Sequence, residues 1–135
     1  MVLLSADRLA LEKSDQIVLV RQTVRERAIE LGFSLVDQTK IVTAASEIAR
    51  NTFVHAGGGT MRVETLSEGS RQGLRLVFED KGPGIADIAT AMKDGFTTGG
   101  GLGLGLGGAK RLSNEFSVES RIGFGTRIVL ARWRG

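Results

Sequence analysis

The stretch Gly99-Gly-Gly-Leu-Gly-Leu-Gly-Leu-Gly-Gly108 contains seven of the 19 glycines in this chain of 135 residues. Glycine at this density disfavours a regular helix or strand, because each glycine costs about 1 kcal/mol relative to alanine there. Large apolar side chains interrupt the glycines at Leu102, Leu104 and Leu106 and need a packing partner, which argues against a plain linker. The stretch therefore predicts a loop whose backbone approaches a ligand closely.

The backbone amides of such a loop, leading into a helix N-terminus, can bind phosphates. Thr97 and Thr98 stand directly before the loop and can add hydroxyl donors. Gly103, Gly105 and Gly108 fit G-x-G-x-x-G, but no strand precedes them and no acidic residue follows about twenty positions later. The sequence also lacks G-x-x-x-x-G-K-[ST], H-R-D and D-F-G, which excludes a standard P-loop and a eukaryotic-type kinase.

Two long helices are expected in the N-terminal part of the chain. Ser14 or Asp15 can cap the first helix and Gly32 can end it. Its apolar stripe comprises Ile17, Val20, Val24, Ala28 and Leu31. Ser34 and Asp37 resemble a capping box that opens the second helix, which ends at the next run of glycines. The apolar residues of that helix are Val36, Ile41, Ala44, Ala45, Ile48, Ala49 and Phe53.

Alternating apolar and polar residues indicate strands elsewhere in the chain. The expected strands are an edge strand at residues 8–13 and two hairpins, 61–65 with 74–78 and 116–119 with 126–133. A short helix near residues 85–92 and a third helix at residues 107–114 flank the glycine-rich loop. This order predicts one α+β domain over residues 1–135, a two-layer α/β sandwich whose mixed, mostly antiparallel sheet is covered on one face by helices.

The segment Glu47-Ile-Ala-Arg50-Asn51 carries the first candidate functional group. Glu47 and Asn51 are four positions apart on the second helix, so they share one face. A carboxylate and an amide oxygen there can hold a hydrated Mg²⁺ ion and orient a hydroxyl or water for attack. Arg50 can pair with Glu47. Taken alone, this pattern is more often a solvated polar face of an amphipathic helix.

The segment Asp80-Lys-Gly82-Pro-Gly84 follows an expected strand. A carboxylate at a strand end can accept a hydrogen bond from the exocyclic amine of adenine, an interaction that guanine does not satisfy. The two glycines allow the backbone to come close to a flat ring. Aspartate, glycine and proline are also ordinary turn residues, so a simple turn is the alternative.

The order of these segments resembles one ATPase superfamily. E-x-x-R-N, D-x-G-x-G, the G-L-G loop and Gly123-x-Gly125-Thr126 follow one another as in the GHKL, or Bergerat-fold, ATPases, which include DNA gyrase and the histidine kinases. The resemblance covers nearly the whole chain. Within the superfamily the chain is similar to the RsbT-type switch serine/threonine kinases of bacterial stress-response modules, over residues 47–51, 79–85, 94–100 and 110–112.

The resemblance implies ATP and Mg²⁺ as cofactors and gives each segment a role. Glu47 would be the general base, with Arg50 as the second catalytic residue, and Asn51 would coordinate Mg²⁺. Asp80 would bind the adenine amine with support from Thr126. The other nucleotide-binding residues would be Gly82, Gly84, Ile85, Thr97, Thr98, Gly99, Gly100, Gly101, Leu102, Gly103, Leu104 and Gly105.

The same resemblance implies a partner-switching regulator. The substrate would be a STAS-domain antagonist protein. Further partners would be a STAS-containing stressosome scaffold and a downstream PPM-type phosphatase or other output protein. Two alternatives stay open: an anti-sigma factor of RsbW type and a non-catalytic nucleotide-dependent binding module. A histidine-kinase catalytic unit with its own dimerisation helices would need a phosphoacceptor histidine, and residues 1–45 contain none.

Composition excludes several other classes of function. The net charge of +3 is spread along the chain, and aromatic residues make up 5% without any tyrosine, which argues against a nucleic-acid partner. The chain has no cysteine and therefore neither a disulfide nor a thiolate metal site. The apolar runs are too short for a signal peptide or a membrane span, which predicts a cytoplasmic protein.

Overall fold

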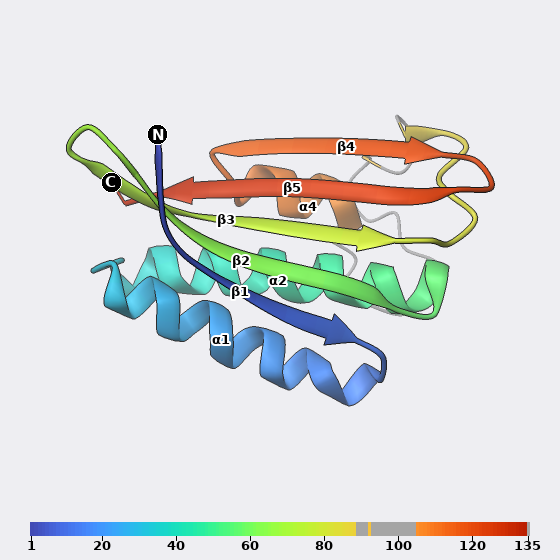
Figure 1. Ribbon diagram of the computed structural model, residues 1–135, viewed down its shortest axis with the longest axis horizontal. Helices are drawn as coiled ribbons and strands as arrows, with labels where there is room; N and C mark the ends of the chain where they lie inside the picture. The colour runs from blue at the N-terminus through green and yellow to red at the C-terminus, as the bar shows by residue number, and fades with distance from the viewer. Residues whose placement is uncertain (89–91, 93–104, 135) are drawn as a thin grey trace.

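The computed structural model describes residues 1–88, 92 and 105–134. Five strands form one sheet in the order β1-β2-β3-β5-β4 (Figure 1). Their bounds are Val2–Leu11 (β1), Gly59–Glu68 (β2), Arg71–Asp80 (β3), Glu115–Arg121 (β4) and Gly125–Trp133 (β5). Every pairing between neighbouring strands of this sheet is antiparallel, without the mixed component that the sequence analysis allowed.

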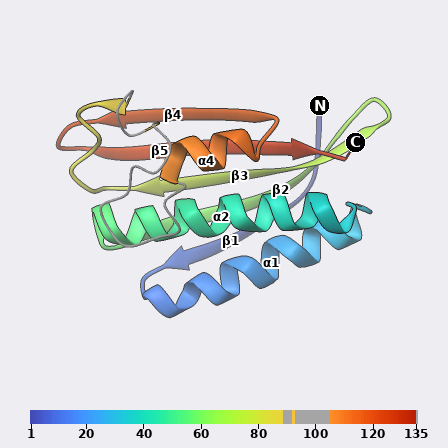
Figure 2. The same cartoon turned by 180° about the vertical axis from the view of Figure 1, so that it is seen from behind.

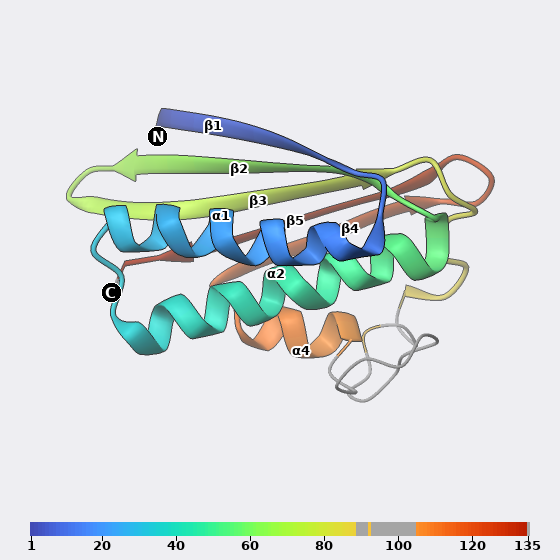
Figure 3. The same ribbon diagram turned by 90° about the horizontal axis from the view of Figure 1, so that it is seen from below.

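The α-helices cover one face of this sheet, as predicted. Within the described residues they are α1 (Ile17–Glu30), α2 (Leu35–Ala56) and α4 (Gly105–Arg111). Figure 3 shows them side by side beneath the strands, with α2 in the middle, and Figure 2 shows the same helix layer from behind. Among the residues that the structure describes, none of these helices combines the length and apolar character needed to cross a membrane.

The core lies between α2 and the middle strands. Side chains alternate along a strand, so every second residue of β3 faces the helices. These residues are Leu74, Leu76 and Phe78, all buried. They belong to one apolar cluster with Ile41, Ala44, Ala45, Ile48 and Ala49 of α2. The small alanine side chains let α2 lie close to the sheet, which completes the α+β sandwich expected from the sequence.

Both ends of α2 have the caps that the sequence predicts. The Ser34 side-chain oxygen accepts a hydrogen bond from the Asp37 backbone N–H at 3.1 Å. Gly57 ends the helix with a φ of 72°, a left-handed conformation that glycine adopts without steric cost. The prediction is wrong for Val36, which is 62% exposed. Val36 precedes Ile41 by five positions, about 140° around a helix of 3.6 residues per turn, and so faces away from the core.

Two boundaries near the N-terminus differ from the sequence prediction. β1 begins at Val2 rather than at residue 8, because its pairing with β2 continues to the far end of the sheet. A short 3₁₀-helix, η1 (Ser14–Gln16), precedes α1. Gln16 is consequently the N-cap of α1, and neither Ser14 nor Asp15 fills that position.

The third helix is also displaced from its predicted bounds. α4 ends at Arg111 rather than at residue 114, because the Asn114 N–H already bonds the Ala131 carbonyl at 2.8 Å on the way into β4. It begins at Gly105, inside the stretch predicted as a loop. The short helix expected near residues 85–92 lies only partly within the described residues.

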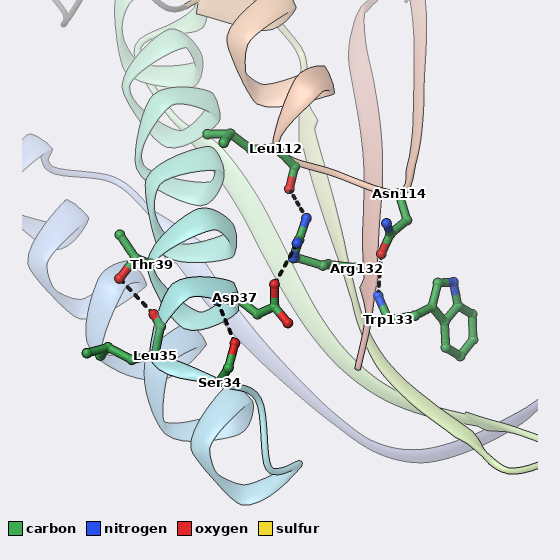
Figure 4. Close-up of polar contacts among 8 residues, drawn as sticks. All are labelled: Ser34, Leu35, Asp37, Thr39, Leu112, Asn114, Arg132 and Trp133. Carbon is green, nitrogen blue, oxygen red and sulfur yellow. Dashed lines mark hydrogen bonds and ion pairs between the residues drawn. The ribbon is translucent and has the colours of Figure 1, made fainter. Parts of the chain in front are cut away.

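One arginine of β5 ties three elements together (Figure 4). Arg132 donates to Asp37 Oδ1 at 2.6 Å, in the first turn of α2, and to the Leu112 carbonyl at 2.9 Å, just after α4. The hydrogen bond from Arg132 lowers the pKa of Asp37 below its ordinary value of 3.8. The contact therefore holds the start of α2 and the end of α4 against the same strand.

Candidate nucleotide-binding site

Asp80 ends β3 on the helix-covered face of the sheet. Its side chain lies on the same face as Phe78, two residues earlier, because strand side chains alternate. The Asp80 Oδ1 atom accepts the backbone N–H of Gly82 at 2.8 Å. This bond fixes the orientation of the carboxylate and leaves Oδ2 as the oxygen that can receive a proton donor from a ligand.

The backbone after Asp80 packs closely against the end of α2. A Cβ atom on Gly82 would lie 2.5 Å from the Cβ of Ala56. A Cβ atom on Gly59, at the start of β2, would lie 3.1 Å from both Asp80 Cβ and Thr52 Cγ2. The structure thus brings the last turns of α2, which carry Asn51 next to Thr52, to the same end of the molecule as Asp80.

The turn between β4 and β5 closes the same end of the sheet. Thr126 is the direct cross-strand partner of Asp80. Gly125 has a φ of 135°, and a Cβ atom there would lie 2.0 Å from the Asp80 carbonyl oxygen. Gly84 has a φ of 83°, and a Cβ atom there would lie 2.6 Å from the Arg121 carbonyl oxygen. Only glycine fits at these two positions. The Gly125 contact holds the turn against Asp80, and the Gly84 contact holds the segment after Asp80 against the end of β4.

Glu47 is a buried carboxylate on α2. The residue is 4% exposed, and its Oε1 atom forms an ion pair with Arg50 Nη1 at 3.0 Å. A buried carboxylate needs such a partner, because an unpaired buried charge is strongly unfavourable. Asn51 lies one turn further along the helix and is half-buried. The predicted pairing of Arg50 with Glu47 is confirmed. The alternative, that Glu47 lies on a solvated face of an amphipathic helix, is wrong because the residue is buried.

The structure adds two residues to this region that the sequence analysis does not identify. Gly59 lies between Asp80 and α2, as described above. Ser120 of β4 accepts the backbone N–H of Ile85 at 2.6 Å and lies 2.8 Å from the Thr126 hydroxyl. Side chains alternate along β4, so Ser120 lies on the same core face as Phe116 and Val118. A polar residue at a core-facing position is the sequence feature that could have identified it.

Several predicted nucleotide-binding residues lie outside the described residues. They are Thr97, Thr98, Gly99, Gly100, Gly101, Leu102, Gly103 and Leu104. Gly105 is described, and it is the buried first residue of α4 with a φ of 58°.

Two hollows border the Asp80 end of the sheet. One, of about 360 Å³, is lined by Glu79, Asp80, Glu119, Ser120, Arg121, Phe124, Gly125, Thr126 and Arg127. The other, of about 530 Å³, is lined by Arg8, Ala56, Gly58, Gly59, Thr60, Glu79, Asp80 and Lys81. Asp80 lines both, so the end of β3 borders open space rather than core.

The side chains at this end of the molecule fit a magnesium ion that is bound together with a nucleotide better than a metal ion held by protein ligands alone. Within the described ranges, no group of three or more histidine, cysteine, aspartate or glutamate side chains could hold a metal ion. Mg²⁺ commonly keeps several waters and binds through one or two protein oxygens together with substrate phosphates. The Asn51 amide oxygen would be one such ligand, and the hollows that Asp80 lines offer open space for a nucleotide base.

Comparison with known proteins places this geometry in a family. Residues 36–134 match the family described as histidine kinase-, DNA gyrase B-, and HSP90-like ATPase. The chain is 50% identical over 117 residues to the serine/threonine-protein kinase RsbT of Bacillus subtilis strain 168, covering 87% of this chain and 88% of the relative. It is 28% identical over 128 residues to the anti-sigma F factor of Clostridium kluyveri, covering 90% and 89%.

Two solved structures share the fold at lower identity. The mycobacterial sensor histidine kinase MprB has a TM-score of 0.55 and 19% identity, over 95% of this chain and 97% of that chain. The catalytic domain of histidine kinase ThkA has a TM-score of 0.53 and 16% identity, over 97% of each chain. The chain therefore belongs to the histidine kinase-, DNA gyrase B- and HSP90-like ATPase family, in the branch of the RsbT-type serine/threonine-protein kinases.

Proposed function

We propose that this protein is an ATP- and Mg²⁺-dependent serine/threonine kinase that phosphorylates a STAS-domain antagonist protein and so regulates bacterial stress signalling by switching partners. The observation that carries the proposal is the 50% identity to RsbT over 87% of the chain. The buried Glu47 on α2, and the fixed Asp80 carboxylate beside the last turns of the same helix, support it. We expect the protein to act in the cytoplasm, where ATP is available.

In this proposal the Asp80 end of the sheet binds the adenine. Asp80 Oδ2 accepts the exocyclic amine, because Oδ1 is already bonded to the Gly82 amide. Thr126 lies beside Asp80 and supports the same contact. Gly82, Gly84 and Ile85 line the base pocket. Phosphate binding is assigned to residues 97–105 on the RsbT likeness alone, and Asn51 would contribute an oxygen to Mg²⁺.

Bound ATP would supply the phosphoryl group, and Mg²⁺ would neutralise charge on the phosphates. Glu47 accepts the proton of the attacking serine or threonine hydroxyl through the carboxylate oxygen that Arg50 does not hold. The hydroxyl oxygen forms the new P–O bond, the bond from the γ-phosphorus to the bridging oxygen breaks, and ADP leaves. Arg50 holds the other carboxylate oxygen, Oε1, and so orients the Glu47 side chain for this step.

The proposed partners follow from the RsbT likeness. Besides the STAS-domain substrate, they are a STAS-containing stressosome scaffold and, once the kinase is released, a PPM-type phosphatase or another output protein. Phosphorylation of the antagonist would change which of these the kinase binds, because a phosphate adds about two negative charges to the contact surface.

The direct test measures transfer of the γ-³²P phosphate from ATP to a serine or threonine of the STAS-domain antagonist from the same bacterium. Glu47→Gln keeps the shape of the side chain but removes the base, so we expect about a 100-fold slower transfer with ATP affinity unchanged. Glu30→Gln, at the exposed end of α1, is the matched control and should label the substrate at the wild-type rate.

Two results would count against this function. Wild-type rates for Glu47→Gln would remove Glu47 from the chemistry. Absence of any labelled STAS protein, with ATP still bound, would reject the proposed substrate.

A second candidate is an anti-sigma factor of RsbW type, favoured by the anti-sigma F relatives at 28% identity over about nine-tenths of the chain. It would share the nucleotide site and differ in its protein-binding surface. Pull-down with the purified protein separates the two: capture of a sigma factor supports the second candidate, and capture of a STAS protein alone supports the first.

A further inference from the structure

Three polar side chains form one row across the end of the sheet. Asp80 of β3 pairs with Thr126 of β5, which pairs with Ser120 of β4. The next row inward is apolar and contains Phe78, Ile128 and Val118. All three polar residues therefore lie on the helix-covered face, at the point where the core gives way to the candidate base pocket.

The Ser120 hydroxyl has three neighbours at hydrogen-bonding distance. It accepts the Ile85 backbone N–H at 2.6 Å, donates to the Gly125 carbonyl at 3.3 Å and lies 2.8 Å from the Thr126 hydroxyl. A serine hydroxyl has one proton and two lone pairs, and a carbonyl can only accept. All three contacts can be hydrogen bonds at the same time in one arrangement only. In that arrangement the Ser120 hydroxyl donates to the Gly125 carbonyl, and the Thr126 hydroxyl donates to Ser120.

This allocation leaves Thr126 with lone pairs only. Its single proton is directed at Ser120, so toward a ligand it acts as an acceptor. The neighbouring Asp80 carboxylate is also an acceptor, with Oδ1 bonded to Gly82 and Oδ2 available. The pocket consequently offers two acceptors side by side to the edge of a base.

Two adjacent acceptors distinguish purines by the group at carbon 6. Adenine carries an amine there, with two N–H donors, whereas guanine and hypoxanthine carry a carbonyl oxygen, which is an acceptor. The amine satisfies both protein oxygens, and the carbonyl satisfies neither. A buried acceptor without a donor is unfavourable, so the arrangement disfavours the 6-oxo bases.

We infer that Ser120 is a positioning residue that makes the site selective for 6-amino purine nucleotides, by holding Thr126 as an acceptor beside Asp80. The inference rests on the proposed nucleotide site and adds the basis of its selectivity. Ser120 also holds the Ile85 amide, which fixes the segment after Asp80 against β4. Without Ser120, the Thr126 hydroxyl can rotate and present its proton to a carbonyl.

The test compares ATP with inosine triphosphate, whose base has a carbonyl oxygen at carbon 6 and no amine at carbon 2. Dissociation constants are measured by calorimetry with Mg²⁺ for the full chain and for Ser120→Ala. We expect the variant to lose about fivefold to tenfold in ATP affinity, the effect of one hydrogen bond, with inosine triphosphate affinity unchanged or higher. Ser117→Ala, on the opposite face of the same strand, is the matched control and should keep the wild-type ratio.

A double-mutant cycle separates positioning from a merely structural role. Because Ser120 acts through Thr126, Ser120→Ala should change the ratio of the two affinities little further once Thr126→Val has removed the acceptor. Ser120→Thr keeps the hydroxyl and should restore the preference for ATP. Thermal unfolding confirms that each variant is folded.

Three outcomes overturn the inference. An equal loss of affinity for both nucleotides in Ser120→Ala would make Ser120 a structural residue only, with the ATP site intact. Additive effects on the ratio in the double variant would show that Ser120 does not act through Thr126. If the wild-type chain bound neither nucleotide, the proposed function would fall together with this inference.

Discussion

At the residue scale, the geometry of the candidate site depends on glycines that are packed so closely that a side chain would not fit. The Asp80 carboxylate is oriented by the Gly82 amide, and Gly82 itself lies against Ala56 at the end of α2. A side chain at this position would push apart the two segments that bring Asp80 and Asn51 to the same end of the molecule.

Gly82→Ala should therefore weaken ATP binding. The added Cβ would lie 2.5 Å from the Ala56 Cβ, so the loop must shift and the bond to Asp80 must lengthen. We expect an ATP affinity lower by about tenfold and a stability loss of about 1–3 kcal/mol, as for other overpacked sites. Calorimetry and urea unfolding measure the two effects.

The control for that change is Gly69→Ala, in the turn between β2 and β3. Its φ of 60° makes alanine unfavourable there, although a Cβ atom would meet nothing within 4 Å. It should lower stability by about 1 kcal/mol and leave ATP affinity unchanged. Equal affinity in Gly82→Ala and wild type would show that the contact with α2 does not shape the site.

At the element scale, local signals predict the caps of α2 but none of the long-range contacts that fix this helix. Ser34 and Gly57 cap α2 as predicted, because capping depends on residues within one turn of the helix end. The bond from Arg132 to Asp37 joins residues 95 positions apart. No local pattern encodes such a contact, since it depends on how β5 lies against α2 after folding.

The Asp37–Arg132 pair should make stability depend on pH. The Arg132 hydrogen bond lowers the pKa of Asp37 in the folded chain below 3.8, the value expected for an unfolded chain. The unfolded state therefore binds more protons in this range, and stability falls as pH falls. The contribution of the pair is complete above about pH 5 and is lost as pH falls from about 3.8 through the lower folded pKa.

Urea unfolding of wild type and Asp37→Asn at about pH 7, 5 and 3 tests this contribution. We expect wild type to be more stable by about 1–2 kcal/mol at the two higher pH values, with a smaller difference at the lowest. Asp15→Asn, in η1, controls for the loss of one exposed acidic group. A difference that stays constant down to the lowest pH would contradict the ion pair as its source.

At the scale of the whole molecule, the sequence predicts the architecture and the order of the functional segments. Helical and strand periodicities are local, so the two-layer arrangement follows from them, and the pairing of Arg50 with Glu47 follows from helical spacing. The positions of Gly59 and Ser120 in the site cannot be predicted from such local patterns. Each depends on strand register, and Ser120 meets Ile85 from 35 positions away.

The fold brings α2, the end of β3 and the turn before β5 to one end of the molecule (Figure 1). Gly59 lies between Thr52 and Asp80, and Gly125 lies against the Asp80 carbonyl. The central claim is that this end binds one magnesium ATP, with Asp80 accepting the base amine and Asn51 close to the phosphates.

Calorimetric titration of the chain with ATP, with and without Mg²⁺, tests that claim most directly. We predict one ATP per chain, tighter binding with Mg²⁺, and an affinity about tenfold lower in Asp80→Asn, whose amide can present a donor to the base amine. Glu68→Gln, exposed at the opposite end of the sheet, should bind as wild type does. Absence of magnesium-dependent ATP binding, or wild-type affinity in Asp80→Asn, would contradict the account.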